Sequence, residues 1–240
     1  HLLSSDAILR RHVHEIIRHF ERQAADDSFL VFCLRHGDDF NIEEAAWLLA
    51  RTQYPDINVE AYQALLDNYA EDLCERIEPG ASARQTLADL NTYLFDDLGF
   101  SGNEENYYDP DNSYLNRVLD RRTGNPITLC LVYMLLTRRL RLPIIGIGLP
   151  GHFICRFQSA SHEIYIDVFN HGRLLTKADC IHHIQTNAGV GVMYDECLAP
   201  VTARRLLARI CANLHQIYVR FDFKEEALRL QRYLVALERP

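Results

Sequence analysis

Basic residues are in the minority in this sequence, and their shortage excludes a first group of functions. The 240 residues contain 25 Lys and Arg against 33 Asp and Glu, which gives a net charge of −8. Nucleic-acid-binding domains usually carry a basic patch and a high isoelectric point, whereas the isoelectric point here is near 5.7. We therefore expect no nucleic-acid partner, and an acidic chain is an equally poor match for an anionic membrane surface.

Long apolar runs, paired cysteine motifs and low-complexity segments are also missing. The longest apolar stretch, residues 127–136, is too short to cross a bilayer as a helix, and no signal peptide is visible. The seven cysteines are scattered, and none belongs to a Cys-x-x-Cys motif. This pattern is typical of reduced thiols, so a cytoplasmic location is expected.

The sequence offers no strong metal or cofactor motif. The segment "DPDNS" spaces oxygen atoms in the manner of a calcium loop, but Tyr114 stands at the sixth loop position and Asp120 at the twelfth. A calcium loop needs glycine and glutamate at those places, so a helix-capping turn is expected instead. The adjacent His182 and His183 do not share a helix face. We expect no metal and no cofactor.

Helix signals dominate the first part of the chain. Asn41 precedes an apolar run and Glu44 follows three residues later, which resembles a capping box. Ser82 opens a further helix, and Gly99 provides its stop. These signals predict a mostly helical N-terminal region over residues 1–99.

Strand signals appear only in the central part of the chain. A helix is predicted from Pro126 to about Leu140, and three β-like segments follow it: "IIGIGL", "HFICRF" and "EIYIDVF". The helix and the strands fall within a central region, residues 100–190. Beyond it, two helices joined by a turn at Asp222 predict a helical hairpin over residues 191–240. One such hairpin cannot bury its own apolar face, so we expect it to pack on the rest of the chain in one compact unit.

His152 and Asp167 are the first candidates for a functional pair. If Phe157 pairs with His162 across the hairpin loop, His152 lies directly opposite Asp167. Opposed side chains on one sheet face have Cβ atoms about 4.5–5.5 Å apart. A carboxylate at that distance can orient an imidazole, as in the His–Asp half of a catalytic triad. A slip of one residue would instead put the two side chains on opposite faces.

Cys130 is the obvious candidate nucleophile, but its place in the predicted helix argues against this role. A thiolate is best stabilised at a helix N-terminus, and the helix here begins at Pro126. Cys130 follows four residues later, ~6 Å further along the axis, within an apolar run. Cys155 is three residues from His152 on one strand and points to the other face. A core role is expected for Cys130.

Three segments of the chain resemble a known family. They are "LFDDLGFSGNEENYYDPDNSYLNRVLDRRTGNPITLCLVY", "LPIIGIGLPGHFICRF" and "IYIDVFNHGRLL". They are similar to the bacterial SirB-type family, a transglutaminase-like domain with a helical N-terminal region and a tetratricopeptide-type C-terminal tail. The resemblance covers about 41–237. It implies an α+β fold with a papain-like core, in which a helix packs on an antiparallel sheet.

The resemblance also assigns positions to a triad. Active members of the transglutaminase superfamily carry Gly-x-Cys at the start of the helix, followed by a histidine and an aspartate on strands. Here Gly124-Asn125-Pro126 matches Gly-x-Cys, while His152 and Asp167 match the other two positions. The resemblance therefore implies a site in which proline replaces the nucleophile. The residues that we expect to line the cleft around it are Gly124, Asn125, Thr128 and Gly151.

Two functions from different classes follow from these residues. The preferred one is a non-catalytic interaction or regulatory protein with a protein partner, because Pro126 carries no nucleophile. The alternative is a cysteine hydrolase or transamidase that uses Cys130, His152 and Asp167. It requires the Cys130 sulfur within about 4 Å of a ring nitrogen of His152. Binding of a small ligand beside His152 is a further alternative.

Overall fold

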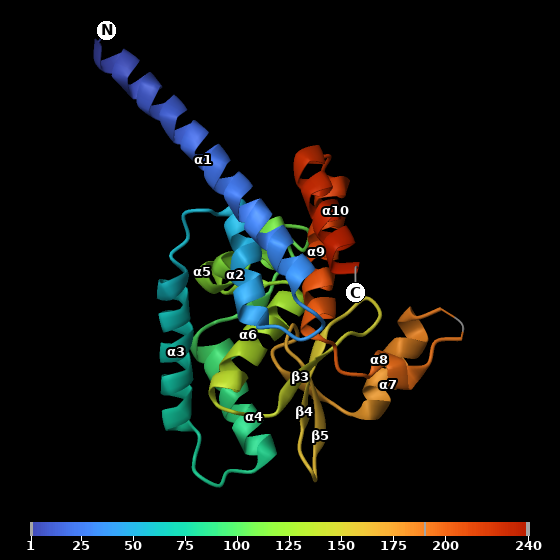
Figure 1. Cartoon of the computed structure of the whole chain (residues 1–240). Helices are drawn as coiled ribbons and strands as arrows, with labels where there is room; N and C mark the ends of the chain where they lie inside the picture. The colour runs from blue at the N-terminus through green and yellow to red at the C-terminus, as the bar shows by residue number, and fades with distance from the viewer. Residues whose placement is uncertain (1, 190, 239–240) are drawn as a thin grey trace.

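The computed structural model describes residues 2–189 and 191–238, with side chains from residue 9 onward. The predicted boundary at residue 190 and the outermost residues of the two terminal regions, His1, Arg239 and Pro240, lie outside the described residues. Figure 1 shows helices arranged around a small sheet, with the first half of α1 (Leu2–Arg35) projecting from the body.

The other elements follow in chain order. The helices are α2 (Ile42–Gln53), α3 (Val59–Arg76), α4 (Ala83–Asn91), α5 (Leu115–Arg121), α6 (Pro126–Arg139), α7 (Lys177–Asn187), α8 (Tyr194–Cys197), α9 (Ala203–Arg220) and α10 (Lys224–Glu238). The strands are β1 (Ser101–Gly102), β2 (Thr123–Gly124), β3 (Ile144–Ile147), β4 (Ile154–Gln158), β5 (Glu163–Asp167) and β6 (Arg173–Leu175). A π-helical turn, η1 (Thr92–Asp97), continues α4, and a 3₁₀ turn, η2 (Pro110–Ser113), precedes α5. The predicted α+β class and its C-terminal helical hairpin are confirmed.

Side-chain caps fix helix starts where the sequence predicts them. Oδ1 of Asn41 accepts a hydrogen bond from N of Glu43 at 3.1 Å, and Oγ of Ser82 accepts one from N of Gln85 at 3.2 Å. The predicted capping box at Asn41 is incomplete. Glu44 is exposed, and within the described ranges none of its side-chain oxygens accepts the backbone N–H of Asn41.

The main sheet is antiparallel and packs against α6. Its strand order is β3-β4-β5-β6. Phe157 and Ile166 lie on one face and belong to the main core together with α6, whereas Ile154 and Tyr165 lie on the other face and pack with α7. The predicted packing of a helix on an antiparallel sheet is confirmed. A short parallel pair, β1 and β2, lies just before α6.

The β4–β5 hairpin turns one residue later than predicted. Phe157 pairs with Ile164 rather than with His162, and residues 159–162 form the loop. Pairing Phe157 with His162 would put an imidazole under α6, whereas the observed register puts an isoleucine there. Each β4 residue therefore meets a partner two positions away from the predicted one. A shift of two keeps every side chain on its predicted face.

One apolar core joins the three predicted regions. It contains Phe29 of α1, Trp47 of α2, Leu129 of α6, Ile166 of β5 and Leu214 of α9, all at most 3% exposed. A second, smaller core lies between the sheet and α7. The division into three domains stays a prediction, and the shared core packs the three regions together.

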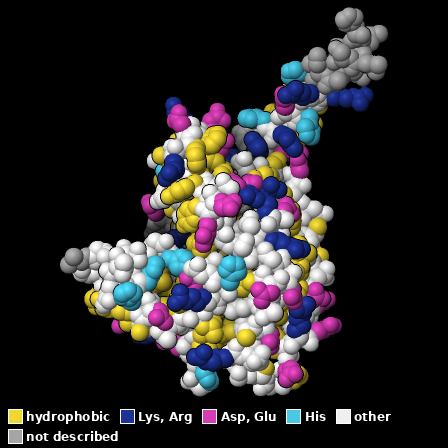
Figure 2. Space-filling model, turned by 180° about the vertical axis from the view of Figure 1, so that it is seen from behind, with side chains coloured by type: hydrophobic (Ala, Val, Ile, Leu, Met, Phe, Trp, Pro, Cys, Tyr) yellow, Lys and Arg dark blue, Asp and Glu magenta, His cyan; other side chains and the backbone are white. Residues whose placement is uncertain are grey.

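The surface carries mixed charges and one apolar end. Figure 2 shows acidic and basic side chains interspersed on the rear face, with apolar side chains gathered over the end of the α9–α10 hairpin. The exposed large apolar side chains at this end of the hairpin are Val219, Phe221, Phe223 and Leu228. Of the helices that the structure describes, none has the length and apolar character that a membrane span requires.

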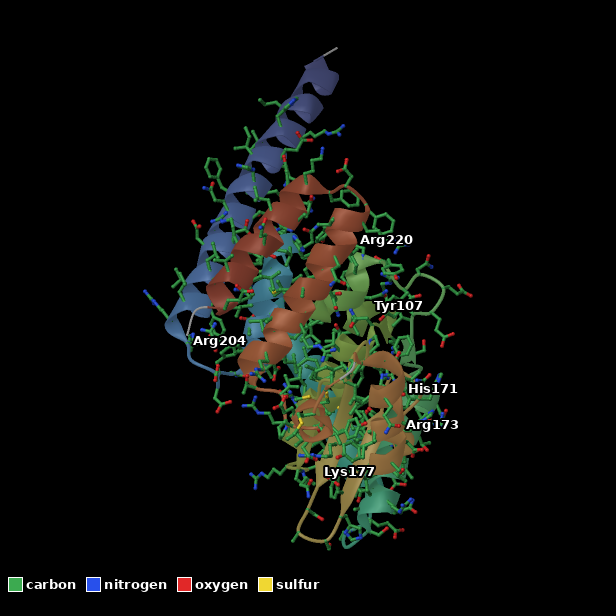
Figure 3. All side chains as sticks on the ribbon, turned by 90° about the vertical axis from the view of Figure 1, so that its right-hand side faces the viewer. Tyr107, His171, Arg173, Lys177, Arg204 and Arg220 are labelled. Carbon is green, nitrogen blue, oxygen red and sulfur yellow. The ribbon has the colours of Figure 1, made fainter. Side chains whose placement is uncertain are left out.

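Arg204 fastens the hairpin to α1. It is 8% exposed and lies at the start of α9 (Figure 3). Nη2 donates to O of Cys33 at 2.9 Å and to O of His36 at 2.6 Å. Nη1 donates to O of Leu237 at 2.9 Å and to O of Ala236 at 3.4 Å. One guanidinium thus satisfies carbonyls at the C-terminal ends of both α1 and α10, where a cation also meets the negative end of each helix dipole.

Replacing Arg204 with alanine is expected to lower the free energy of unfolding by about 3 kcal/mol, because buried carbonyl oxygens lose a charged donor. Urea denaturation followed by circular dichroism measures this loss. The matched control is Arg205→Ala, an exposed neighbour on the same helix, which should change the free energy by less than about 0.5 kcal/mol. Equal losses in the two variants would contradict the assigned role of Arg204.

Candidate functional site

The start of α6 is fixed by Asn125. This residue is 5% exposed, and its Oδ1 accepts hydrogen bonds from N and Oγ1 of Thr128 at 3.0 and 3.1 Å. Its Nδ2 donates to Oγ of Ser113 at 2.8 Å, and its backbone N donates to O of Asn112 at 3.2 Å. Both ends of the amide are satisfied, so Asn125 is held rigidly between η2 and α6.

Pro126 occupies the first position of α6. Proline suits this place because the first helical N–H has no intrahelical acceptor. Gly124 is closely packed, since a Cβ there would lie 3.1 Å from Cγ1 of Val118 and 3.3 Å from Cγ of Leu129. The position that the resemblance gives to a nucleophile therefore holds a side chain without a nucleophilic or acid–base group.

His152 and Asp167 are joined by a hydrogen bond between Nε2 and Oδ1 at 2.9 Å. Their side chains are 15% and 11% exposed. The corrected register makes them diagonal rather than direct cross-strand neighbours, and long side chains still meet at that separation. Within the described part of the chain, Nδ1 of His152 has no hydrogen-bond partner. The pair thus orients the ring and leaves Nδ1 available.

The pKa of Asp167 lies below its ordinary value of 3.8. Burial by itself raises this pKa, but the interactions with His152 and the hydrogen bonds from Asn170 together outweigh the effect of burial. Asn170 contributes in the same direction, donating from Nδ2 at 2.8 Å and from N at 3.3 Å. Asp167 is therefore ionised over the ordinary pH range and offers His152 a fixed acceptor.

The turn that carries His152 is held from α9. Nη2 of Arg209 donates to O of Leu149 at 3.1 Å and to O of His152 at 2.9 Å. Gly151 has a φ of +69°, a conformation that glycine adopts without strain. The ring of His183, from α7, lies 5.8 Å from that of His152 between centroids. Among the described residues, no three His, Cys, Asp or Glu side chains gather in a way that could hold a metal ion.

Cys130 lies in the core. It is fully buried, and its Sγ donates to O of Phe153 at 3.5 Å. Burial, followed by the neighbouring Cys155, raises the pKa of Cys130 well above its ordinary value. Over the residues that the structure describes, no hydrogen bond joins Cys130 to His152. Cys155 also faces the core, with Sγ 3.8 Å from O of Cys130. The buried surroundings of Cys130 disfavour its thiolate.

A cleft of about 240 Å³ opens beside Pro126 and His152. Asn125 and Gly151 line it, but the expectation that Gly124 and Thr128 also line it is corrected, because both are buried behind the helix start. The residues that line the cleft are Tyr107, Tyr108, Asn125, Pro126, Ile127, Gly151, His152, Phe153, Arg209, Asn213, Gln216 and Ile217.

One wall of the cleft comes from α9, and the sequence pattern does not predict this wall. Arg209, Asn213 and Gln216 are spaced by four and three residues, so they lie on one helix face. Tyr107 lies toward the same end of α9 as Arg220 (Figure 3). The spacing is visible in the sequence, but no local signal shows that this face of α9 turns toward α6.

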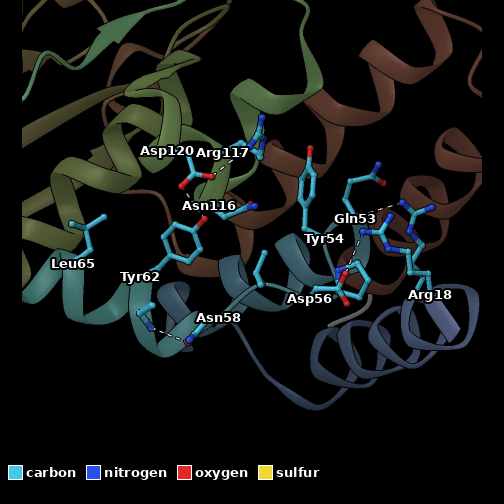
Figure 4. Close-up of a pocket in the computed structure, with 14 residues that line it drawn as sticks. Arg18, Gln53, Tyr54, Asp56, Asn58, Tyr62, Leu65, Asn116, Arg117 and Asp120 are labelled. Carbon is cyan, nitrogen blue, oxygen red and sulfur yellow. Dashed lines mark hydrogen bonds and ion pairs between the residues drawn. The ribbon is translucent and has the colours of Figure 1, made fainter. Parts of the chain in front are cut away.

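A larger cavity, of about 860 Å³, lies between α1, α3 and α5 and contains none of the predicted site residues (Figure 4). Its charged groups are largely paired with one another. Arg18 lies 3.4 Å from Asp56, and Arg117 lies 3.4 Å from Asp120, which also accepts a hydrogen bond from Tyr62 at 2.9 Å. Arg22, the remaining charged residue of this lining, donates from Nη2 to O of Gln53 at 3.5 Å.

Comparison with known proteins places relatives in bacteria and in mammals. The sequence pattern of the transglutaminase-like superfamily matches residues 60–212. The UPF0162 protein of Xylella fastidiosa strain 9a5c is 38% identical over 188 residues, which are 77% of this chain and 67% of the relative. The UPF0162 protein of Pseudomonas aeruginosa is 28% identical over 187 residues, covering 78% of this chain and 67% of the relative.

A more distant relative belongs to a longer protein. Human F-box only protein 21 is 29% identical over 188 residues, which are 66% of this chain and 29% of that protein. No solved structure matches the chain. The matched residues 60–212 contain the start of α6, the His152–Asp167 pair and Arg209 of the α9 wall.

The Asp167→Asn variant is expected to be less stable than the unchanged protein by roughly 2 kcal/mol at pH 7, since a buried charged acceptor is lost. Asp167 has a lowered pKa in the folded state, so its contribution is present above the ordinary value of 3.8 and disappears as the pH falls through the folded value. The gap between the two proteins should therefore close below about pH 4.

Urea denaturation between pH 3 and 7 (roughly the range in which carboxyl groups titrate) measures this gap. The control is Asp195→Asn, whose side chain is 90% exposed and which should follow the unchanged protein. A gap that stays constant down to the lowest pH would show that Asp167 is not the group responsible.

Proposed function

The chain belongs to the transglutaminase-like superfamily and to the UPF0162 family, and from this premise we propose that it is a degenerate member that binds a protein partner without catalysis. The observation that carries the proposal is Pro126 at the start of α6, in the same cleft as His152. Nucleophilic catalysis needs a thiol or hydroxyl within reach of the base, and proline supplies neither. At position 126 the His152–Asp167 pair then has no nucleophile to activate.

The burial of Cys130 supports this proposal over a cysteine hydrolase or transamidase. A nucleophilic thiol is activated by a neighbouring base or by a lowered pKa. Cys130 instead donates to a backbone carbonyl, and burial raises its pKa. The alternative assignment of Cys130, His152 and Asp167 as a triad therefore lacks its first member.

The α9–α10 hairpin is the surface that we propose for the partner. Its outer end carries exposed apolar side chains, including Phe221 and Phe223, each 51% exposed, and aromatic residues are enriched at protein interfaces. The hairpin resembles a single tetratricopeptide-type unit, as the SirB-type resemblance implies. In human F-box only protein 21 the similar region is part of a longer chain, which supports a role as a binding module. A cytoplasmic location belongs to the same proposal.

Iodoacetamide should label Cys130 slowly in the folded protein, because its sulfur is buried and its pKa is raised. Cys74, which is exposed, serves as the internal control and should react at the rate of an ordinary thiol. Mass spectrometry after timed labelling near neutral pH measures both sites, and both should label readily in urea. Fast labelling of Cys130 that disappears in His152→Ala would overturn the proposal in favour of a cysteine enzyme.

The Pro126→Cys variant should gain the reactivity that the natural chain lacks. A thiol at the first position of α6 meets the helix N-terminus and His152, and both favour the thiolate. Alkylation of the introduced thiol near neutral pH is expected to be roughly tenfold faster than that of Cys74. The double variant Pro126→Cys, His152→Ala should lose much of this gain. Equal rates for the introduced thiol and Cys74 would show that residue 126 does not occupy the nucleophile position.

A further inference from the structure

Arg209 is a largely buried cation without an acidic partner. Its Nη2 donates to the backbone oxygens of Leu149 and His152, and Nη1 lies against Gly148. Within the described residues, Arg209 forms no ion pair with Asp or Glu. Its guanidinium lies over the ring of Phe153, 5.3 Å from the centroid. Burial lowers the pKa of Arg209, which reflects the cost of holding this charge away from water.

The same face of α9 adds further unused donors. Asn213 and Gln216 follow Arg209 at four and seven residues, and all three line the cleft. Among the residues described, the side chains of Asn213 and Gln216 make no hydrogen bond. Amide groups carry two N–H donors each, so this face presents a cation flanked by further donors.

The rest of the cleft does not neutralise this charge. Of its described lining residues, none is Asp or Glu, and Arg209 is the one Lys or Arg. The N-terminus of α6 adds a partial positive charge from the opposite wall, at Pro126 and Ile127. His152 is hydrogen-bonded to Asp167, which is not among the lining residues of the cleft. The lining of the cleft therefore presents the cation of Arg209 and the partial positive charge of the helix N-terminus, and its described side chains include no carboxylate.

The volume of the cleft limits the size of its occupant. At about 240 Å³ it is smaller than the ~300–1,000 Å³ of ordinary small-molecule sites. It suits one short side chain or a small acid rather than a nucleotide or a sugar chain. The walls at Tyr107 and Phe153 are aromatic, so they suit an aliphatic stem.

We propose that this cleft binds a carboxylate on a short aliphatic stem, paired with the guanidinium of Arg209 and hydrogen-bonded by Asn213 and Gln216. The proposal rests on the proposed non-catalytic function of the same cleft, and it names what the cleft holds in place of a reacting substrate. The carboxylate belongs either to an acidic side chain of a protein partner or to a free dicarboxylic acid.

The test uses matched charged and neutral probes on the full chain. The charged probes are N-acetylglutamate N-methylamide, which represents a side chain within a peptide, and free glutarate. The neutral controls are N-acetylglutamine N-methylamide and glutaramide. Titrations followed by ¹H–¹⁵N NMR, including the Nε–Hε signal of Arg209, give each dissociation constant. Each acid should bind at least about tenfold more tightly than its amide, because its charge-assisted hydrogen bonds are stronger.

The source of the carboxylate is read from the two acids. At least about tenfold tighter binding of the peptide-like acid assigns a protein side chain, since only that probe carries the flanking amides. Tighter or equal binding of glutarate assigns a free acid. Either result supports the proposal as long as each acid binds more tightly than its matched amide.

Two variants connect the binding to Arg209. Asn213→Asp puts a carboxylate one helical turn from Arg209 and leaves the bonds from Arg209 to Leu149 and His152 in place, so binding of both acids should fall at least about tenfold. Asn68→Asp adds the same charge at an exposed position of α3 and should leave binding unchanged. Arg209→Gln should also lose binding, and its thermal unfolding shows whether the turn is intact.

The proposal is overturned if the amides bind as tightly as the acids, if no acid binds, or if Asn213→Asp binds as well as the unchanged protein. These outcomes are separable from a failure of the proposed function. Slow labelling of Cys130 without carboxylate binding would remove this inference alone, whereas fast labelling that depends on His152 would remove the non-catalytic function.

Discussion

The hydrogen bonds of Asn125 are the constraint on which the site depends. One side chain ties Ser113 of η2 to Thr128 of α6, so the direction of the central helix and the position of the preceding loop are set together. The helix in turn covers one face of the sheet, and His152 and Asp167 lie at the ends of the strands beside it. If Asn125 moved, Pro126 and His152 would no longer share a cleft.

Much of the arrangement of α6 and the His152–Asp167 pair can be predicted from short stretches of sequence. The start of α6 follows from Asn125 and Pro126, whose capping and φ preferences are local properties. The meeting of His152 and Asp167 follows from the alternation of a strand, which survives a register shift of two. The interior position of Cys130 also follows from local sequence, because the residue lies one turn beyond the helix start within an apolar run. These features depend on neighbours within a few residues or on one hairpin.

The features that the sequence did not yield depend on how distant segments dock. The hairpin register depends on whether an isoleucine or His162 lies under α6. Only the packed core decides between the two residues. Thr128 was expected in the cleft but is turned inward by its hydrogen bond to Asn125. Arg209, Asn213 and Gln216 come from α9, which is held by Arg204 near its start and by the Tyr114–Tyr218 hydroxyl pair, 2.9 Å apart, near its end.

The bonds from Arg209 to the turn at His152 make the C-terminal hairpin and the cleft one thermodynamic unit. If an occupant binds more tightly when Arg209 is in its present position, it also favours the docked hairpin. Binding in the cleft and binding at the outer end of α9–α10 would then change each other's affinity by the same factor. Binding at the outer end of the hairpin would then change the affinity of the cleft, although no covalent bond forms or breaks.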